Sequence, residues 1–400
     1  MSFLYSISRT ANPSNEDLKW CIYIGLMHYY YYKGPFLVVK KVSAADAGPK
    51  VEESDQTTIE TYSLYDIKTY QKFGLNILEN VSIIGHACAN ANLEFLDWWL
   101  ASGLELKYDE WAIAFASQYG HVCVLNWFLD SGLELKYDCR AISFASAGGH
   151  LHILNWWLDS GLELKYDSEA IELASENGHI DILNWWLCSG LELKYEQWAI
   201  ELACENGDIH VLNWWLDSGL ELIYDYQAIN WASEKGHIHV LNWFLGSGLE
   251  FKYSERAINR ASKNGHLDVL NWFLDSGLEL KYDAEAIKLA SENGHLLVLN
   301  WFLGSGLELK YDCGAIDSTI KKCGIKVIEW WIQSGLPLKY TECPVTWASE
   351  NGYISVLKAW ALAALPFDSV EKAIALASEQ DQTEVLNWWK EMGFDSDPKN

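Results

Sequence analysis

The chain has 400 residues and a formal net charge of −26, and half of its residues are apolar, including 22 tryptophans. This composition supports a large buried core and excludes an intrinsically disordered chain. Nearly all of the excess negative charge lies in residues 81–400, which hold 21 basic and 46 acidic residues. Because so acidic a surface repels phosphate backbones and anionic bilayers, we expect neither a nucleic acid nor a membrane as partner.

Residues 1–58 do not share the pattern found in the rest of the chain. Their composition predicts a helix over Glu16–Tyr32, a short strand over Phe36–Val42 and a polar linker over residues 44–58. The apolar run at residues 20–32 is too short to span a bilayer, and the N-terminus does not resemble a signal peptide. The nine cysteines show no disulfide or metal-binding spacing, so we expect free thiols in a reducing cytoplasm.

From residue 81 onward the chain repeats every 29 residues, and tryptophan marks the period. The column consists of Trp98, Trp127, Trp156, Trp185, Trp214, Trp243, Trp272, Trp301 and Trp330. It continues through Ala359 and Trp388, so residues 81–400 hold about eleven repeats, the last of which turns polar as a terminal cap must. Residues 59–80 carry a degenerate half-repeat that we expect to cap the first full repeat. This period predicts a solenoid in which each repeat buries its apolar face against its neighbours.

Each repeat predicts two short helices, as residues 167–195 illustrate. Asp167 stands at a helix N-cap position, and helix one follows it as far as Gly178. Helix two follows His179, carries apolar residues at helical spacing and ends at Gly190. The last five residues alternate apolar and polar, which predicts a short extended connector. The expected fold class is therefore an all-α solenoid of stacked helix-turn-helix repeats, and we expect a monomer.

Two adjacent aromatic positions in helix two, represented by Trp185 and Trp186, are the most conspicuous feature of the repeat. Helix one offers alanine and serine at matching positions, so we expect both rings to pack in the core against small side chains. A row of tryptophans can also stack sugars, which leaves a carbohydrate-binding array as an alternative.

The register of these residues resembles that of ankyrin-repeat proteins over about residues 60–400. Helix one, residues 169–175 followed by Gly178-His179, lies on the ankyrin pattern T-P-L-H-x-A-A…G-H, and helix two with residues 190–193 lies on V-V-x-L-L-L-x-x-G-A-D-V. Ankyrin units usually have about 33 residues, and the roughly four missing here fall where the β-hairpin finger projects. The resemblance implies shortened or absent hairpins and a non-enzymatic role in protein binding.

No pattern in the chain predicts catalysis, a cofactor or a metal site. The histidine column after the helix-one glycine comprises His121, His150, His179, His237, His266 and His295. Its members lie one repeat apart, on the order of 10 Å along packed helices, which is too far for shared metal ligation. As the ankyrin resemblance implies, we expect these histidines to bind loop backbone.

Partner contact is predicted at positions that vary while their surroundings stay fixed. In ankyrin-like stacks the first turn of helix one lines the concave face, and tryptophan and arginine are enriched at binding hot spots. The candidates are Trp111, Arg140, Trp198, Tyr226, Trp231, Arg256 and Arg260. Drift of exposed positions explains the same variation. The sequence thus predicts a scaffold that binds an unidentified protein on its concave face, with a substrate-recruiting adaptor that docks through the N-terminal segment as a further alternative.

Overall fold

The computed structural model describes residues 2–8, 35–42 and 59–394, apart from residues 323, 342 and 368. The chain divides into two compact halves, residues 1–199 and 200–400. The helix predicted over Glu16–Tyr32 and the whole of the linker predicted over residues 44–58 lie outside the described residues.

A small antiparallel sheet precedes the repeats. Its strands β1 (Ser2–Ser8), β2 (Phe36–Val42) and β3 (Ile59–Ser63) lie in the order β1-β2-β3. The strand predicted over Phe36–Val42 is confirmed, whereas β1 was not predicted. The first residues of the predicted half-repeat form β3, and its remainder forms α1 (Ile67–Phe73) and the short helix η3 (Ile77–Glu79).

The rest of the described chain consists of paired helices, which confirms the helical solenoid. The first helices of the repeats are α2 (Ile83–Ala89), α4 (Glu110–Gln118), α6 (Arg140–Ala147), α8 (Glu169–Glu176), α10 (Trp198–Asn206), α12 (Tyr226–Lys235), α14 (Glu255–Asn264), α16 (Ala284–Glu292), α18 (Gly314–Lys321), α20 (Pro344–Glu350) and α22 (Val370–Glu379). The second helices are α3 (Leu93–Ser102), α5 (Val122–Ser131), α7 (Leu151–Asp159), α9 (Ile180–Cys188), α11 (Ile209–Asp217), α13 (Ile238–Ser247), α15 (Leu267–Asp275), α17 (Leu296–Gly304), α19 (Ile325–Gln333), α21 (Ile354–Leu362) and α23 (Thr383–Glu391).

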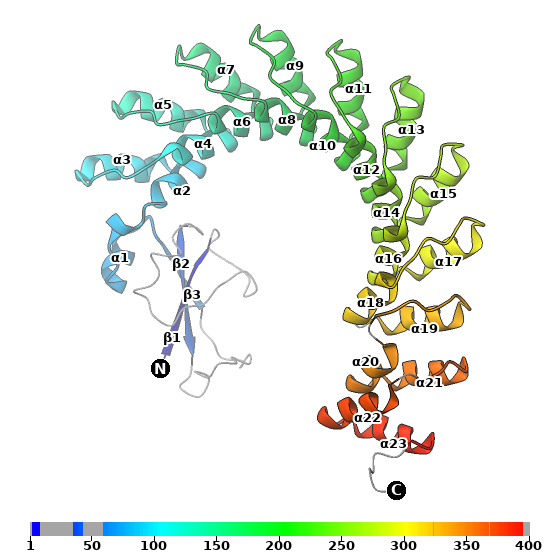
Figure 1. Cartoon of the computed structure of the whole chain (residues 1–400). Helices are drawn as coiled ribbons and strands as arrows, with labels where there is room; N and C mark the ends of the chain where they lie inside the picture. Colours follow the sequence, from blue (N-terminus) through cyan, green and yellow to red (C-terminus); the bar gives the residue numbers. More distant parts are fainter. Residues whose placement is uncertain are drawn as a thin grey trace. The chain divides into compact units, whose positions relative to one another are not determined.

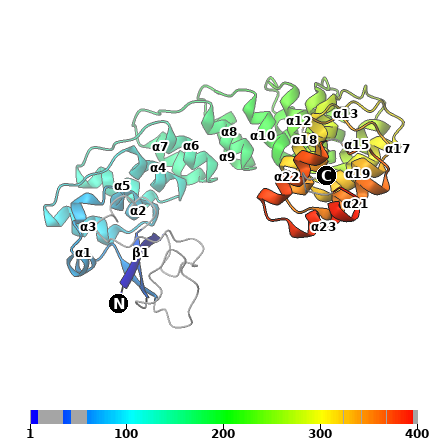
Figure 2. The same ribbon diagram turned by 60° about the horizontal axis from the view of Figure 1, so that its bottom comes forward.

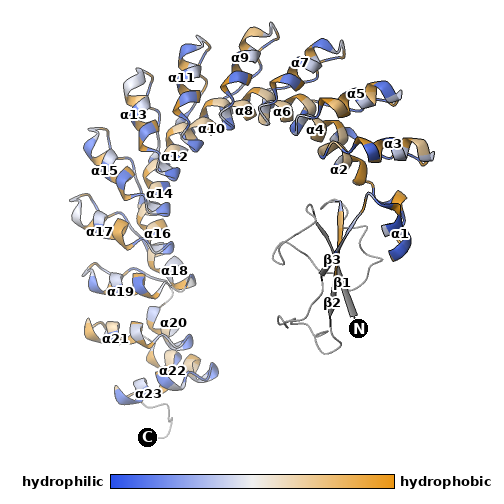
Figure 3. Cartoon of the chain, turned by 180° about the vertical axis from the view of Figure 1, so that it is seen from behind, coloured by the Kyte–Doolittle hydropathy of each residue, from blue (hydrophilic) through white to orange (hydrophobic). Residues whose placement is uncertain are grey.

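Within each half the helices form two rows. First helices of neighbouring repeats pack against one another, as α4 does with α6 and α12 with α14, and second helices pack against the first helix of their own repeat, as α5 does with α4 and α13 with α12. We call the row of first helices the helix-one row; in each half it lies on the inner side of the curve, and the second helices fan outward (Figure 1). A view turned by 60° shows the same sequential stacking from α3 to α9 (Figure 2). Hydrophobic residues occur in every repeat of each half (Figure 3), as expected when each repeat buries a face against its neighbours.

Caps and glycines set the helix bounds, although α8 has Ser168 at its N-cap where Asp167 was predicted. The Asp283 carboxylate accepts a hydrogen bond from the backbone N–H of Glu285 at 3.0 Å, which satisfies one of the unpaired N–H groups of the first turn. At the other end of helix one, Gly149 has a φ of +68°, a conformation that glycine adopts without strain. A Cβ there would also lie 2.8 Å from the ring of His179 in the next repeat. Glycine is therefore needed for its backbone angle and for the close approach of the next repeat.

The first tryptophan of each pair links neighbouring repeats through its indole N–H. In the first half, Trp156 Nε1 donates to Asn126 Oδ1 at 2.7 Å, and Trp185 Nε1 donates to Asn155 Oδ1 at 2.8 Å. The same bond recurs in the second half, from Trp243, Trp272, Trp301 and Trp330 to the asparagine 30 residues earlier. These indoles are half-buried. The expectation that both rings lie in the core is therefore wrong for the first ring, which needs an edge position to reach its acceptor.

The second aromatic position is the core of the stack. Trp157, Trp186, Trp215, Phe244 and Phe273 are all at most 1 % exposed. Where this ring is an indole, a helix-one serine 40 residues earlier can accept its N–H: Ser146 Oγ lies 3.2 Å from Trp186 Nε1. The prediction that large rings of helix two face small residues of helix one is confirmed for this position, with the hydrogen bond as an added constraint.

The connectors stack without forming strands. Tyr137 OH donates to the backbone oxygen of Glu163 at 2.9 Å. Lys165 Nζ donates to the backbone oxygen of Tyr137 at 3.3 Å and lies 4.5 Å from the centre of the Tyr137 ring. After Ser63 the described residues contain no strand, so the β-hairpin finger is absent there, as predicted. Charge-assisted and cation–π contacts replace the missing hairpin ladder.

In the core, the ring of helix two pairs with a small helix-one residue that lies 40 residues earlier: serine accepts the N–H of an indole, and cysteine faces a phenylalanine. Two repeats depart from this pairing. Cys88 and Cys204 lie 40 residues before Phe128 and Phe244, so a ring without an N–H faces a thiol with little need of a hydrogen bond. Ser233 and Ser262, in contrast, lie 40 residues before Phe273 and Phe302. Both serine hydroxyls are buried and have no hydrogen-bond partner. A buried, unsatisfied hydroxyl costs on the order of 1–3 kcal/mol. These two repeats are therefore less stable than repeats in which serine pairs with tryptophan or cysteine with phenylalanine.

We predict that Ser233→Cys and Ser262→Cys each stabilise the chain by about 1 kcal/mol, because each substitution removes an unsatisfied hydroxyl and restores the cysteine–phenylalanine pairing. The urea midpoint measured by circular dichroism should rise with no change in slope. The matched control, Ser146→Cys, removes the acceptor of Trp186 and should lower the midpoint. If all three variants shift the midpoint in the same direction, the pairing rule is wrong.

Candidate functional site

The helix-one row carries all seven residues predicted to contact a partner. Three are large aromatic side chains with much of their surface exposed, namely Trp111 at 39 %, Trp198 at 43 % and Tyr226 at 44 %. Arg256 is also exposed, whereas Arg140, Trp231 and Arg260 are half-buried. The seven thus differ in exposure, with four exposed and three half-buried side chains.

Arg140 is held by its own half of the chain. Its Nε donates to Asp138 Oδ2 at 2.9 Å, and its Cζ lies 4.1 Å from the ring centre of Trp111, one repeat earlier. The hydrogen bond from Arg140 lowers the pKa of the Asp138 carboxyl below its usual range, although burial opposes the shift. The ring of Phe144 lies 6.0 Å from that of Trp111, centre to centre. The structure therefore brings together two predicted residues, Trp111 and Arg140, as one stacked cluster.

A cavity of about 840 Å³ opens beside Trp111 in the first half. Its lining includes Val81, Gly85 and His86, in or just before α2, and Trp111 and Tyr119, in or just after α4. Val81 is 63 % exposed and Tyr119 is 52 % exposed, so much of the apolar wall faces solvent. Sequence reasoning missed both residues. The signal for Tyr119 was available, because the equivalent position in most other repeats is polar or glycine.

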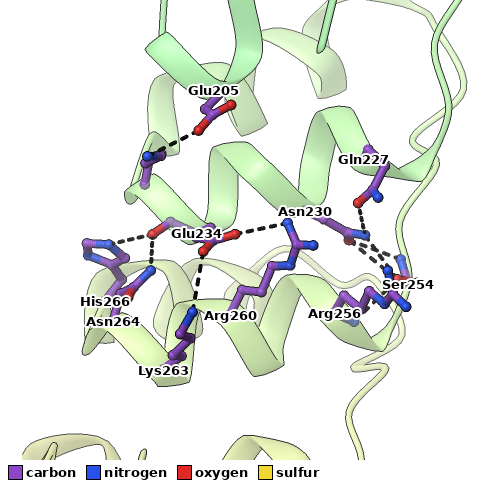
Figure 4. Close-up of polar contacts among 11 residues, drawn as sticks. Glu205, Gln227, Asn230, Glu234, Ser254, Arg256, Arg260, Lys263, Asn264 and His266 are labelled. Atoms are coloured by element: carbon purple, nitrogen blue, oxygen red, sulfur yellow. Dashed lines mark hydrogen bonds and ion pairs between the residues drawn. The ribbon is translucent and has the colours of Figure 1, made fainter. Parts of the chain in front are cut away.

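In the second half, Glu234 organises the polar face of α12 and α14 (Figure 4). Arg260 Nη1 lies 2.9 Å from Glu234 Oε2, and Lys263 Nζ lies 3.9 Å from Glu234 Oε1. The backbone oxygen of Glu234 accepts from Asn264 Nδ2 at 2.7 Å and binds His266 Nε2 at 2.9 Å. Arg260 therefore has an internal partner on the neighbouring helix, and its charge is largely compensated.

Arg256 has different surroundings from Arg260. Its backbone N–H is capped by Ser254 Oγ at 3.3 Å, but within the described second half its guanidinium makes no hydrogen bond or ion pair. The polar groups drawn next to it, Gln227, Asn230 and Ser254, are neutral and bind one another (Figure 4).

A buried carboxyl group lies near this surface. Glu201 is 0 % exposed; its Oε1 accepts the backbone N–H of Asp225 at 3.2 Å, and its Oε2 has no partner. Burial, together with the side-chain contact to Asp225, raises the pKa of Glu201 from its ordinary value of 4.5 to about 7. The equivalent contact two repeats later uses a neutral amide, because Asn259 Nδ2 donates to Asp283 Oδ1 at 2.8 Å.

The histidine column binds backbone, as predicted. His121 Nε2 lies 3.0 Å from the oxygen of Ala89, and His179 Nε2 lies 3.0 Å from the oxygen of Ala147, each one repeat earlier. No group of three or more metal-ligating side chains occurs in the part of the chain that the structure describes. In that same part, no helix is both long and apolar enough to cross a membrane.

The tryptophan row has little capacity left for stacking sugars. The inner rings of the pairs are buried, and the outer rings use their N–H groups to bind the neighbouring repeat. Stacking on an outer ring would have to use a face that is only partly exposed.

Comparison with known proteins identifies the repeat. Residues 229–274 match the family model described as ankyrin repeats (many copies), which confirms the predicted resemblance over the stretch that contains α13 and α14. The chain is also similar to an uncharacterized protein of Acanthamoeba polyphaga mimivirus, with 42 % identity over 66 residues. That match spans 16 % of this chain and 20 % of the viral protein.

We predict that Glu201→Gln stabilises the second half above pH 7 and has little effect below pH 4.5. The folded state holds the Glu201 proton more tightly than the unfolded state does, so wild-type stability falls as pH rises from 4.5 to about 7. The difference between variant and wild type should grow over that window, up to about 3 kcal/mol. Urea unfolding at several pH values measures it, with the exposed residue Glu169 changed to Gln as control. A constant difference between Glu201→Gln and wild type across the window would contradict the shifted pKa.

Proposed function

Because the chain contains ankyrin repeats, which generally mediate protein–protein interactions, we propose that it is a non-enzymatic scaffold that binds a protein partner through the helix-one row. One observation carries the proposal. The recurring tyrosine, histidine and first tryptophan side chains bind the neighbouring repeat, whereas Trp111, Trp198 and Tyr226, which occur where the repeats differ, are large and exposed.

The physical chemistry of these side chains suits protein recognition. An exposed aromatic ring on a packed helix offers a large apolar area with little conformational entropy to lose on binding. In the first half, the stacked pair of Trp111 and Arg140 is already ordered, and the cavity beside it can receive a side chain of the partner. Most of the recurring polar side chains, in contrast, are committed to the neighbouring repeat.

The N-terminal residues 59–80 serve as a cap in this proposal. The ring of Tyr65 lies 4.9 Å from that of Phe95 in the first full repeat, centre to centre, and Asn80 Nδ2 donates to Tyr70 OH at 2.9 Å in a buried contact. These contacts support a segment that covers the exposed end of the stack. An adaptor would require residues 1–58 to bind a second partner. The proposed scaffold function does not require this.

We predict that the triple variant Trp111→Ala/Trp198→Ala/Tyr226→Ala loses the bound partner. Tagged wild type and variant are expressed in the native host, and the co-purified proteins are quantified by mass spectrometry. The specific partner should fall at least about tenfold, because hot-spot aromatics each contribute about 1–2 kcal/mol or more.

A matched control replaces three exposed leucines of the second helices, Leu129, Leu158 and Leu245, with alanine. This variant should retain the partner. If the triple aromatic variant retains the same proteins as wild type, the helix-one row is not the binding surface. If the leucine control loses them instead, the binding surface lies on the second helices.

A further inference from the structure

The segment α14 stands out in charge from the other first helices. It carries Arg256, Arg260 and Lys263 against one acidic residue, Glu255, whereas no other first helix in the chain has a net charge above +1. The whole chain has a net charge of −26. A first helix with three basic residues against one acidic residue is an unusual feature in so acidic a protein, and it includes two of the predicted contact residues.

Comparison of Arg256 with Arg140 shows why only one of them is available. The two arginines occupy the same position of the repeat. Arg140 is held by the carboxylate of Asp138 and by the ring of Trp111. The equivalent positions around Arg256 hold Ser254 and Gln227. Both internal partners have been replaced by neutral polar side chains, so the guanidinium of Arg256 is left exposed and uncompensated.

No nearby acidic side chain takes the place of the carboxylate that holds Arg140, since the acidic residues named below have other partners. Glu234 is engaged by Arg260 and Lys263, and Lys288 pairs with Glu285 at 2.9 Å. Gln227 and Ser254 are held by Asn230 (Figure 4). The positive charge of Arg256 therefore faces solvent in an ordered setting, which favours capture of an anionic group from outside.

The same two helices contain features that do not serve stability. Ser233 Oγ, Asn259 Oδ1 and Ser262 Oγ are buried without a partner, and all three belong to α12 or α14. Natural proteins depart from consistent packing mostly at functional sites. This independent observation points to the same pair of helices as the uncompensated charge.

We infer that the surface of α12 and α14 binds an acidic peptide segment of the partner, with Arg256 contacting a carboxylate and Tyr226 providing an apolar platform. Tyr226 and Arg256 lie in the first turns of adjacent, packed helices, and both are exposed. The inference rests on the proposed scaffold function and names the chemistry of its ligand. A nucleic acid is the less favoured anion, because the surrounding acidic surface repels a long phosphate backbone whereas a short peptide needs to place only one or two carboxylates.

The test is a selection from a random dodecapeptide phage library on the full-length chain. The enriched peptides should contain aspartate or glutamate, and their affinity should fall at least about tenfold for Arg256→Gln, since a charge-assisted hydrogen bond is lost. The matched control Lys322→Gln, which also removes one positive charge from the second half, should bind them like wild type, because Lys322 pairs with Glu292 at 3.0 Å. For Arg256→Glu, a peptide whose carboxylate is replaced by lysine should regain affinity. Circular dichroism melts confirm that each variant is folded.

The outcomes separate this inference from the scaffold function. Peptides that bind the Arg256→Gln variant as tightly as wild type, or that carry no acidic residue, overturn the inference; if those peptides still depend on Trp111 or Trp198, the scaffold proposal stands. Peptides that depend on none of the helix-one residues overturn both. Binding of a double-stranded oligonucleotide that Arg256→Gln abolishes overturns the choice of a peptide ligand.

Discussion

The structure depends on hydrogen bonds whose donor and acceptor lie one repeat apart. The indole of Trp156 reaches Asn126, the hydroxyl of Tyr137 reaches the backbone of residue 163, and the ring of His179 reaches the backbone of residue 147. Each bond requires the next repeat to sit at a fixed rise and rotation. A 29-residue repeat without a β-hairpin can therefore stack in register, because side chains provide the connections that a hairpin ladder would otherwise supply.

Such stacking limits which residues can be used for recognition. A side chain committed to the neighbouring repeat cannot vary without loss of a buried or half-buried bond, whose loss costs on the order of 1 kcal/mol or more. Variation is tolerated where no such bond exists, chiefly in the first turn of helix one. Tyr226 and Arg256 occur there, and the helix-one row is the surface most easily adapted to a partner.

The second half contains the clearest departures from regular pairing. Ser233 and Ser262 face phenylalanine, and Glu201 is a buried acid that remains partly protonated near neutral pH. Each departure reduces the stability of the repeats around α12 and α14. In a solenoid, such losses stay local because each repeat contacts only its neighbours. The stack can therefore accommodate a less stable, more positively charged segment without losing the order of its other repeats.

The sequence alone determined the repeat, the two helices, the aspartate caps and the glycine stops, because these depend on periodicity and on local backbone chemistry. It also indicated which positions vary. Only the tertiary structure decided that Trp186 is buried, whereas Trp185 lies at the edge of the core and binds Asn155. It also decided that strand β1 pairs with β2, and that Arg140 stacks on a tryptophan whereas Arg256 is exposed. These outcomes depend on which residues come into contact in the folded chain. The spacing of residues within a single repeat does not determine those contacts.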